Sequence, residues 1–409
     1  MTFLMYFVGS ENVYHSLNVF NGYIALLGHK LPQQIFEKRS NDSYNGTIET
    51  IKDDSRTGIK FIVQNKQEIH HVFFLKVHKA ASSTGMNIMM RFALSRNLSI
   101  MIPRRIRNSF SQQSTLRADL ILDYSPGTVY DIACNHVVFE KKKIIQFMPP
   151  DTVFIGTVRH PFSQFRSAFL YYRNTYYLKY LQDIPGPNPM LTYLKNPLRY
   201  ETNISKYLSF TNNRMSLDYG ATVQDTEAMK RYVDRLDQDF HLILLVERFN
   251  ESLVLLKRLL GWKTKDILHI PQKRYRGPTV IKSQLLESLH KKWARLDYIL
   301  YGHFKQKFES LLAAQDEMFY KELDYFKNIL SRTTAFCAQF EVQSLLVPKS
   351  RWNTEFTVTS SDCVLIKMKS KTMNKMVRNL YLNKKTPPPK YYKAQVKLID
   401  IRHGIQNTQ

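Results

Sequence analysis

Three apolar runs, each followed by a helical pattern, constrain the fold of this chain most strongly. They are "HVFFLKV" (His71–Val77), "DTVFIGTV" (Asp151–Val158) and "HLILLVERF" (His241–Phe249). Runs this apolar are typical of strands that are buried on both faces of a parallel sheet. Their alternation with helices predicts an α/β fold in which a central parallel sheet is flanked by helices, with right-handed crossovers.

Apolar residues recur at helical spacing after the second and third runs and again near the C-terminal third. Gly261 follows the third pattern as an expected helix C-cap, and residues 281–330 have the same period. The apolar positions are Phe165, Phe169 and Tyr172; Leu253, Leu256 and Leu260; and Leu285, Leu289, Trp293, Leu296 and Leu300.

The chain divides into three parts by composition. We expect an irregular arm over residues 1–70, the sheet-containing domain over 71–335, and a C-terminal extension with a basic tail over 336–409. The segment 365–393 has no acidic residue and contains three consecutive prolines, which favours a solvated, loosely ordered tail. Binding of this tail to an acidic surface is the alternative.

The sequence contains no run of 18 apolar residues, and the opening "MTFLMYFVG" is too short to span a bilayer. Taken literally, the chain is expected to be soluble; the alternative is that its N-terminus is incomplete. Five Asn-x-Ser/Thr triplets, which begin at Asn41, Asn45, Asn97, Asn203 and Asn250, are acceptors only in a secreted context.

The three cysteines, Cys134, Cys337 and Cys363, form neither a disulfide framework nor a zinc pattern. One bridge between Cys337 and Cys363 is conceivable, although the spacing does not support it. Buried thiols are the alternative.

The balance of charge favours anionic partners. Lys and Arg (59) exceed Asp and Glu (34) by 25, which suits a nucleotide, a nucleic acid, an acidic glycan or an acidic lipid. Charge alone does not choose among them.

The stretch "FLKVHKAASSTGMNIMMRF" predicts an anion site, because it places a loop between a strand and the N-terminus of a helix. Helical N–H groups at that end have no partner within the helix, and the helix dipole adds positive charge. Lys79 supplies a full charge, while Ala80 and Ala81 let the backbone approach a ligand closely. Together with the hydroxyls of Ser82, Ser83 and Thr84, these groups suit a phosphate or a sulfate.

The same loop has two alternative interpretations. A serine here can simply cap the helix while Lys79 is solvated. A P-loop nucleotidase requires G-x-x-x-x-G-K-[ST], whereas this loop has no glycine before Gly85 and places its lysine before the small residues.

The stretch "VRHPFSQFRSAF" (Val158–Phe169) supplies a second element of the predicted site. Arg159 ends a strand, Pro161 opens a helix, and Ser167 follows the arginine by eight residues. An arginine at a strand end and a serine in the next helix can hold one anion together.

The combination of these two elements resembles the galactose 3-O-sulfotransferases, which are Golgi enzymes and include galactosylceramide sulfotransferase. Their loop reads "FLKTHKTASST", and here it is "FLKVHKAASST", with Val77 and Ala80 in place of two threonines. Further similar stretches are "CNHVVF" (Cys134–Phe139), "ERFNESLVLLKRLLGW" (Glu247–Trp262) and "WARLDYILYGHF" (Trp293–Phe304). The resemblance covers about residues 70–335.

The resemblance implies a P-loop-like sulfotransferase fold and the co-substrate 3′-phosphoadenosine 5′-phosphosulfate, with no metal. By position, the loop would hold the donor's 5′-phosphosulfate, and Arg159 and Ser167 would hold its 3′-phosphate. The loop residues concerned are Lys76, Lys79, Ala80, Ala81, Ser82, Ser83 and Thr84. The acceptor would be the 3-hydroxyl of galactose on a glycolipid or glycan.

Two histidines are candidates for the base that takes the proton of the sugar hydroxyl. His136 follows the apolar run "VYDIACNH", and its surroundings also resemble a stretch of the uronyl 2-O-sulfotransferases. His78 stands beside Lys79. We expect His136 to be the base and His78 to orient the substrate or stabilise the transition state, with the reverse assignment open.

Other residues have weaker functional predictions. We expect Glu247 at the end of the third strand, where it would orient the acceptor or form a structural ion pair. The aromatic stretch "FLYYRNTYYLKY" (Phe169–Tyr180) would supply sugar-stacking rings or ordinary helix packing.

Alternatives to a galactose sulfotransferase remain open on the sequence. A glycosaminoglycan sulfotransferase would also suit the net charge, and a third possibility is a donor-binding or glycan-binding protein without catalysis. We expect no nucleic-acid partner, because the chain carries no recognised nucleic-acid-binding signature. The family resemblance implies a lumenal domain at the Golgi membrane, although no anchor is visible in the sequence.

Overall fold

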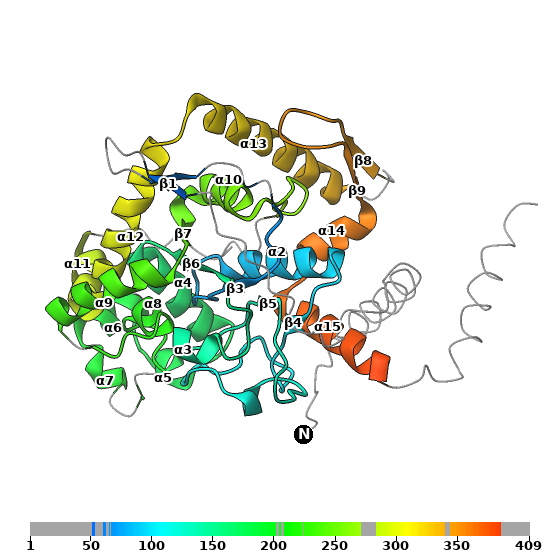
Figure 1. The fold of residues 1–409 in the computed structure, drawn as a ribbon. Helices are drawn as coiled ribbons and strands as arrows, with labels where there is room; N and C mark the ends of the chain where they lie inside the picture. Colours follow the sequence, from blue (N-terminus) through cyan, green and yellow to red (C-terminus); the bar gives the residue numbers. More distant parts are fainter. Residues whose placement is uncertain are drawn as a thin grey trace, which may run out of the picture.

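A five-stranded parallel sheet forms the centre of the protein, which confirms the predicted fold class (Figure 1). Its spatial order is β4 (Ile100–Met101), β5 (Ile132–Ala133), β3 (Val72–Phe74), β6 (Val153–Val158) and β7 (Leu242–Leu245). The computed structural model describes residues 51–53, 60–62, 65, 67–201, 204–205, 208–223, 225–270, 284–339 and 344–385.

The order of the strands locates a switch point beside β3. The chain runs from β3 to β4 and β5 on one side, and then crosses to β6 and β7 on the other. In open α/β sheets, ligands bind outside the carboxyl ends of the strands at such a switch. The carboxyl ends of β3 and β6 are therefore the place to look for a site.

Two of the central strands are shorter than predicted. β3 ends at Phe74, and beyond it the carbonyl of Lys76 accepts from the ring of His136. β7 ends at Leu245 because residues Val246–Arg248 form a 3₁₀ turn. Glu247 therefore lies in this turn, and its predicted place at a strand end is wrong.

Helices cover both faces of the sheet. α2 (Ser82–Ser95) packs on β3 and β5, and Phe92 in α2 stacks on Trp262, which follows α10 (Phe249–Leu260), with ring centroids 3.7 Å apart. α12 (Arg295–Ala313) packs on β6 and β7. Since the β3-to-β4 and β6-to-β7 connections run in opposite directions, right-handed crossovers place their helices on opposite faces.

The other described elements surround this core. Their bounds are α3 (Lys141–Ile144), α4 (Pro161–Asn174), α5 (Lys179–Gln182), α6 (Pro189–Lys195), α7 (Leu198–Glu201), α8 (Arg214–Asp218), α9 (Thr226–Asp239), α11 (Gln284–Trp293) and α13 (Glu317–Ala338), with short antiparallel pairs β1 (Ile51–Asp53) with β2 (Lys60–Ile62) and β8 (Ser344–Val347) with β9 (Phe356–Thr359). A 3₁₀ turn occupies Ala118–Leu120.

The predicted apolar stripe over residues 281–330 is interrupted. Residues 281–283 lie outside the described residues, and the rest of the stretch is divided among α11, α12 and α13. Leu285 is 53% exposed and so does not belong to the stripe, whereas Leu300 is buried. The predicted boundary after residue 335 falls inside α13.

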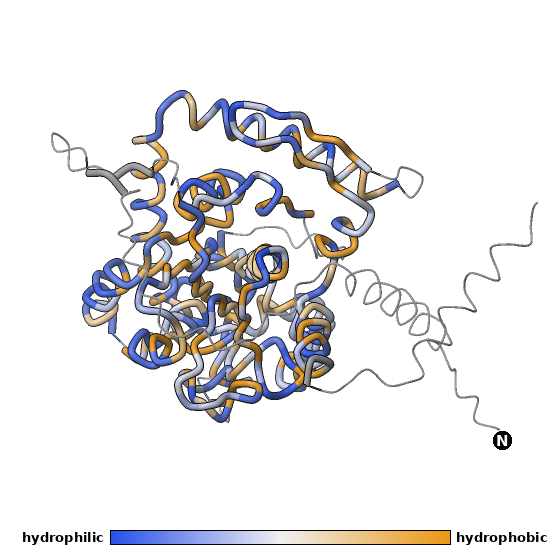
Figure 2. The backbone as a smooth tube through the Cα atoms, turned by 45° about the vertical axis from the view of Figure 1, so that its right-hand side comes forward, coloured by the Kyte–Doolittle hydropathy of each residue, from blue (hydrophilic) through white to orange (hydrophobic). Residues whose placement is uncertain are grey.

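The C-terminal extension is not a loose tail up to residue 385. α14 (Ser360–Lys367) and α15 (Ser370–Lys385) both pack on α2. Met373, Met376 and Val377 are buried, so α15 has an apolar stripe among its lysines, and the prediction of a solvated tail is wrong for this segment. In Figure 2 the outer helices alternate between apolar and polar segments, as packed surface helices do. Residues 386–393 of the predicted tail lie outside the described residues.

A disulfide joins Cys337 at the end of α13 to Cys363 in α14, with 5.3 Å between their Cα atoms. The alternative of buried thiols is thus wrong for these two residues, while Cys134 is a buried free thiol. Among the described helices, none has the length and apolar character needed to cross a membrane. Most of the predicted N-terminal arm lies outside the described residues.

Candidate active site

The loop between β3 and α2 has the backbone of an anion cradle. Lys79 and Ala81 have positive φ angles of 59° and 54°, with Ala80 between them in an ordinary conformation. Such alternation turns successive N–H groups toward one side, which forms a concave anion site. The N–H groups of Ser82 and Ser83 begin α2 and have no partner within the helix. Non-glycine residues with positive φ are strained, and such strain is concentrated at functional sites.

Side chains fix this loop from within. The hydroxyl of Ser82 donates to the carbonyl of Val77, and Ala80 is completely buried. Ser82 is thereby committed to the loop itself, whereas Ser83 and Thr84 are half-buried at the start of the helix. The cap interpretation does not apply to α2, because its N-cap residue is Ala81, which has no side-chain cap.

Lys79 and Arg159 meet at the carboxyl ends of β3 and β6. Arg159 Nη1 donates to the carbonyl of Lys79 at 2.9 Å, and Lys79 Nζ lies 4.0 Å from the centroid of the Tyr171 ring. Burial lowers the pKa of Arg159 from its ordinary value, but a guanidinium remains charged near neutral pH. Arg159 from the end of β6 thus contacts the loop that carries Lys79, and the binding of an anion by the two cations stays a prediction.

Of two polar residues of α4, one donates a hydrogen bond to the loop and the other has no described contact with it. The helix begins at Pro161, as predicted, and Ser167 lies half-buried on its second turn. No described contact joins Ser167 to Arg159, so their joint grip on one anion stays a prediction. Gln164 on the same helix is buried and donates to the carbonyl of His78 at 3.0 Å.

His136 is brought to the loop from the end of β5. Its Nδ1 lies 2.6 Å from the carbonyl of Lys76, which can only accept, so Nδ1 carries the proton and Nε2 holds a lone pair. The backbone of His136 is held by Asn108 and Phe110 in the connection from β4. Lys76 itself is buried, and its Nζ lies 2.9 Å from Sδ of Met86 in α2.

His78 stacks on His136 with ring centroids 3.9 Å apart. Burial, and after it the cation of Arg214, lower the pKa of His78 to about 4, although Asp218 opposes this. Burial, followed by the charges of His78 and Lys76, also lowers the pKa of His136 well below its ordinary value. Both predicted bases are therefore neutral, and able to accept a proton, at neutral pH.

Most of the chain matches one known family. A sequence profile described as galactose-3-O-sulfotransferase matches residues 40–355. The chain belongs to the galactose-3-O-sulfotransferase family.

Individual members of the family are moderately similar to the chain. Galactose-3-O-sulfotransferase 2 from Sus scrofa is 33% identical over 258 residues, which are 60% of this chain and 63% of that protein. Galactosylceramide sulfotransferase from Bos taurus is 31% identical over 243 residues, which are 58% of this chain and 56% of that protein. The chain thus aligns with less than two thirds of the length of these relatives, and the match to the family profile ends before α14.

Sequence reasoning missed two residues that lie against the predicted family site. Arg214 and Asp218 are buried, form an ion pair of 2.8 Å within α8, and contact His78. Their only sequence signal is the i, i+4 spacing in "NNRMSLDYG", and that spacing occurs more often on exposed helix faces. α8 is in turn held by the buried carboxylate of Asp297 from α12, which accepts from the backbone N–H of Ser216 at 2.7 Å.

The predictions for Glu247 and for the aromatic stretch Phe169–Tyr180 have different outcomes. Glu247 is exposed and accepts from the backbone N–H of His160 at 2.9 Å. Within the predicted aromatic stretch, Phe169 and Tyr172 are core residues, while Tyr171 lies against Lys79.

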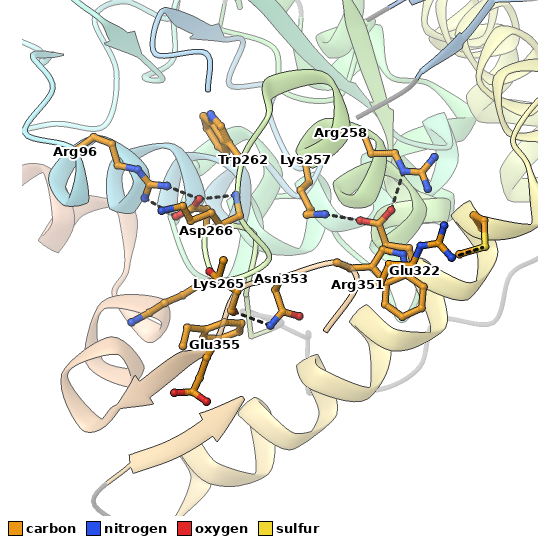
Figure 3. A pocket seen from close by; sticks show the side chains of 15 residues that line it. Arg96, Lys257, Arg258, Trp262, Lys265, Asp266, Glu322, Arg351, Asn353 and Glu355 are labelled. Carbon is orange, nitrogen blue, oxygen red and sulfur yellow. Dashed lines mark hydrogen bonds and ion pairs between the residues drawn. The ribbon is translucent and has the colours of Figure 1, made fainter. Parts of the chain in front are cut away.

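A cavity of about 610 Å³ lies away from the family site (Figure 3). It is lined by residues of α10, α13 and the β8–β9 connection, and by Arg96 just after the C-terminal end of α2. Since α2 has 14 residues, this end is about 20 Å from the loop. Its cations are largely paired: Arg96 with Asp266, and Lys257 and Arg258 with Glu322. We therefore do not assign the donor to this cavity.

Proposed function

We propose that this chain transfers a sulfuryl group from 3′-phosphoadenosine 5′-phosphosulfate to the 3-hydroxyl of a galactose on a glycolipid or glycan. One observation carries the proposal: a strained N–H cradle with Lys79 lies at the sheet's switch point, beside Arg159 and a pair of neutral histidines. Membership of the family supports the same reaction.

The donor would lie with its phosphosulfate on the cradle. The N–H groups of Ser82 and Ser83 and the ammonium of Lys79 would bind the bridging phosphate and sulfate oxygens, where charge develops as the S–O bond breaks. Arg159, and by resemblance Ser167, would hold the 3′-phosphate. Ala80 and Ala81 leave room for the backbone to approach.

The acceptor step requires a base. The galactose hydroxyl would give its proton to the Nε2 lone pair of a histidine while its oxygen attacks sulfur. The bond between sulfur and the bridging oxygen breaks, and adenosine 3′,5′-bisphosphate leaves with the electron pair. His136 and His78 each meet the requirement of a neutral, buried imidazole whose Nδ1 has an acceptor. His136 remains our first assignment.

The proposed location is the lumen of the Golgi apparatus. The Cys337–Cys363 disulfide supports an oxidising compartment, because such bonds are rare in the cytosol. The glycosylation triplets that begin at Asn97 and Asn250 give weaker support for this compartment. In the second of them, Ser252 is completely buried.

The test is transfer of radiolabelled sulfate to galactosylceramide, lactose-type glycans and heparan in parallel. We expect transfer to a galactose acceptor and an approximately 10²-fold or larger loss of kcat/KM in Lys79→Ala. Lys263→Ala is the matched control, because Lys263 is an exposed lysine at the distant cavity. Wild-type transfer by a folded Lys79→Ala protein, or transfer to heparan alone, would contradict the proposal.

A further inference from the structure

Asp218 makes three contacts with one histidine of the site. Its Oδ2 accepts from the backbone N–H of His78 at 2.7 Å, and His78 Nδ1 lies 2.9 Å from Oδ1 and 2.8 Å from Oδ2. Both residues are buried, with exposed fractions of 3% for His78 and 2% for Asp218. Neither sequence spacing nor the family resemblance pointed to Asp218.

We propose that Asp218 is a positioning residue, which keeps the proton of His78 on Nδ1 and so leaves the Nε2 lone pair available to the substrate. This inference rests on the proposed sulfuryl transfer and adds to it a residue that acts through His78.

The position of the proton follows from the partners of Nδ1. A carboxylate can only accept, and an unprotonated Nδ1 at 2.8 Å would place two lone pairs against each other. Arg214 Nε donates both to Asp218 Oδ1, at 3.1 Å, and to His78 Nδ1, at 3.2 Å. The contacts of Nδ1 with the two carboxylate oxygens are shorter, at 2.9 and 2.8 Å, and a carboxylate cannot donate, so we place the proton on Nδ1 and leave Nε2 without one.

The carboxylate is itself held in place. Arg214 Nη2 donates to Asp218 Oδ1 at 2.8 Å, and the first turn of α8 is held by Asp297. Burial alone would raise the pKa of Asp218, but the Arg214 cation and the contacts with His78 lower it, so the group stays ionised. Asp218 by itself would raise the pKa of His78 and so favour a second proton on the ring. The positive charge of Arg214 opposes this effect, so His78 stays neutral between turnovers.

The other ring nitrogen supplies an independent observation. His78 Nε2 is buried and has no hydrogen-bond partner in the part of the chain that the structure describes. Buried polar atoms without a partner are rare in native structures and require an explanation. A substrate hydroxyl that arrives at this nitrogen would provide its missing donor.

The first test measures the wild-type protein, and a variant serves only to assign its signals. Nitrogen NMR of histidine-labelled protein with adenosine 3′,5′-bisphosphate should show His78 Nε2 as unprotonated, with the signal assigned from its loss in His78→Gln. A protonated Nε2 in the wild type would overturn the inference.

The second test separates positioning from mere support of the fold. In Asp218→Asn, the new amide can donate to Nδ1, so the proton should move to Nε2. We expect kcat to fall by about 10²-fold or more, with the affinity for adenosine 3′,5′-bisphosphate unchanged by calorimetry. If the unpaired Arg214 prevents folding, the double variant Arg214→Gln/Asp218→Asn removes both buried charges and should show the same loss. A folded variant with wild-type kcat would contradict the role of Asp218.

Asp266→Asn is the matched control, because Asp266 is also a buried aspartate paired with an arginine, Arg96, at 2.6 Å (Figure 3). It should leave kcat and the His78 signals unchanged. An equal loss of kcat in this control would show that loss of any buried ion pair explains the effect, against our inference. A wild-type protein that fails to bind adenosine 3′,5′-bisphosphate would instead refute the proposed function, whatever the state of His78.

Discussion

At the scale of single residues, burial decides which groups of the site are ready to react. His78 and His136 are both buried, stacked on each other and surrounded by cations, so their protonated forms are disfavoured. A histidine in water has a pKa of about 6.5 and would be partly protonated in a mildly acidic compartment. Burial would therefore keep either histidine unprotonated, and available as the proposed base, in such a compartment.

The first prediction concerns the dependence of kcat/KM on pH. Burial lowers the pKa of both candidate bases, to about 4 for His78 and well below the ordinary value for His136. Whichever of the two is the base, it is unprotonated at neutral pH, so kcat/KM should stay constant from neutral pH down to about 5. Below that, it should fall as protonation removes the lone pair.

Rates of the wild type measured in buffers of constant ionic strength would test this expectation. Circular dichroism at each pH separates loss of the base from acid unfolding. Half-maximal kcat/KM near pH 6.5 in a folded protein would show that neither buried histidine is the base.

At the scale of elements, α15 reaches the site from beyond the region that matches the family profile. Asn374 in α15 is buried and donates to Asn135 Oδ1 at 2.7 Å, directly beside His136. It also donates to the carbonyl of Arg107 at 3.0 Å. This helix thus holds both the end of β5 and the connection that packs on His136.

The second prediction is that Asn374→Ala lowers kcat without changing donor affinity. Loss of the amide leaves Asn135 unsatisfied and frees the segment that carries His136, which should reduce kcat by about tenfold. Steady-state kinetics with calorimetry of adenosine 3′,5′-bisphosphate would measure both quantities.

Lys375→Ala is the control, because Lys375 is the exposed neighbour of Asn374 on the same helix. Equal kcat values for the two variants would show that α15 does not position His136.

A disulfide anchors this C-terminal region to the remainder of the chain. The bond between Cys337 and Cys363 closes a loop with a sequence separation of 26 residues. The third prediction is that Cys337→Ser/Cys363→Ser lowers the free energy of unfolding by about 3 kcal/mol, since the unfolded chain is no longer constrained. Urea unfolding of oxidised wild type and of the double variant would measure the difference. Cys134→Ser, which changes a free thiol, is a control for the loss of a sulfur atom; equal stability of wild type and double variant would contradict the prediction.

At the scale of the whole molecule, the carboxyl and amino ends of the strands carry different kinds of residues. The carboxyl edge carries the strained loop, the cations and the histidines. At the amino edge, His71 bridges strands: its Nδ1 lies 2.7 Å from Asp151 before β6, and its Nε2 lies 3.4 Å from Asp131 before β5. These contacts connect β3 to its two neighbours, β5 and β6, at the amino ends of the strands.

The fourth prediction concerns stability and pH through His71. Burial would lower its pKa, but hydrogen bonds to Asp131 and Asp151 raise it above the ordinary value. A group whose pKa is raised on folding contributes its full stability below the unfolded value of about 6.5, and this contribution is lost as pH rises through the folded value. Wild type should therefore exceed His71→Gln by about 1 kcal/mol in free energy of unfolding at pH 6, and by less at pH 9.

Urea unfolding of both proteins at the two pH values would measure this change. A stability difference that grows from pH 6 to about pH 9 would contradict the sign.

Much of the fold was predictable because its signal is local. The apolar runs determine the buried strands. The helical spacing of the apolar residues that begin at Phe165 and at Leu253 determines α4 and α10. The loop "HKAASST" predicted a cradle, since a short turn between a strand and a helix leaves few other conformations.

The amino-acid sequence by itself therefore determined the parallel sheet and the position of the loop between β3 and α2, because both depend on residues close together in the chain. Only the tertiary structure decided what surrounds the histidines. Asp218 follows His78 by 140 residues, and Asn374 follows Asn135 by 239 residues. No local pattern encodes such contacts; they arise when the strand order brings distant segments to one end of the sheet, where buried polar groups must find partners.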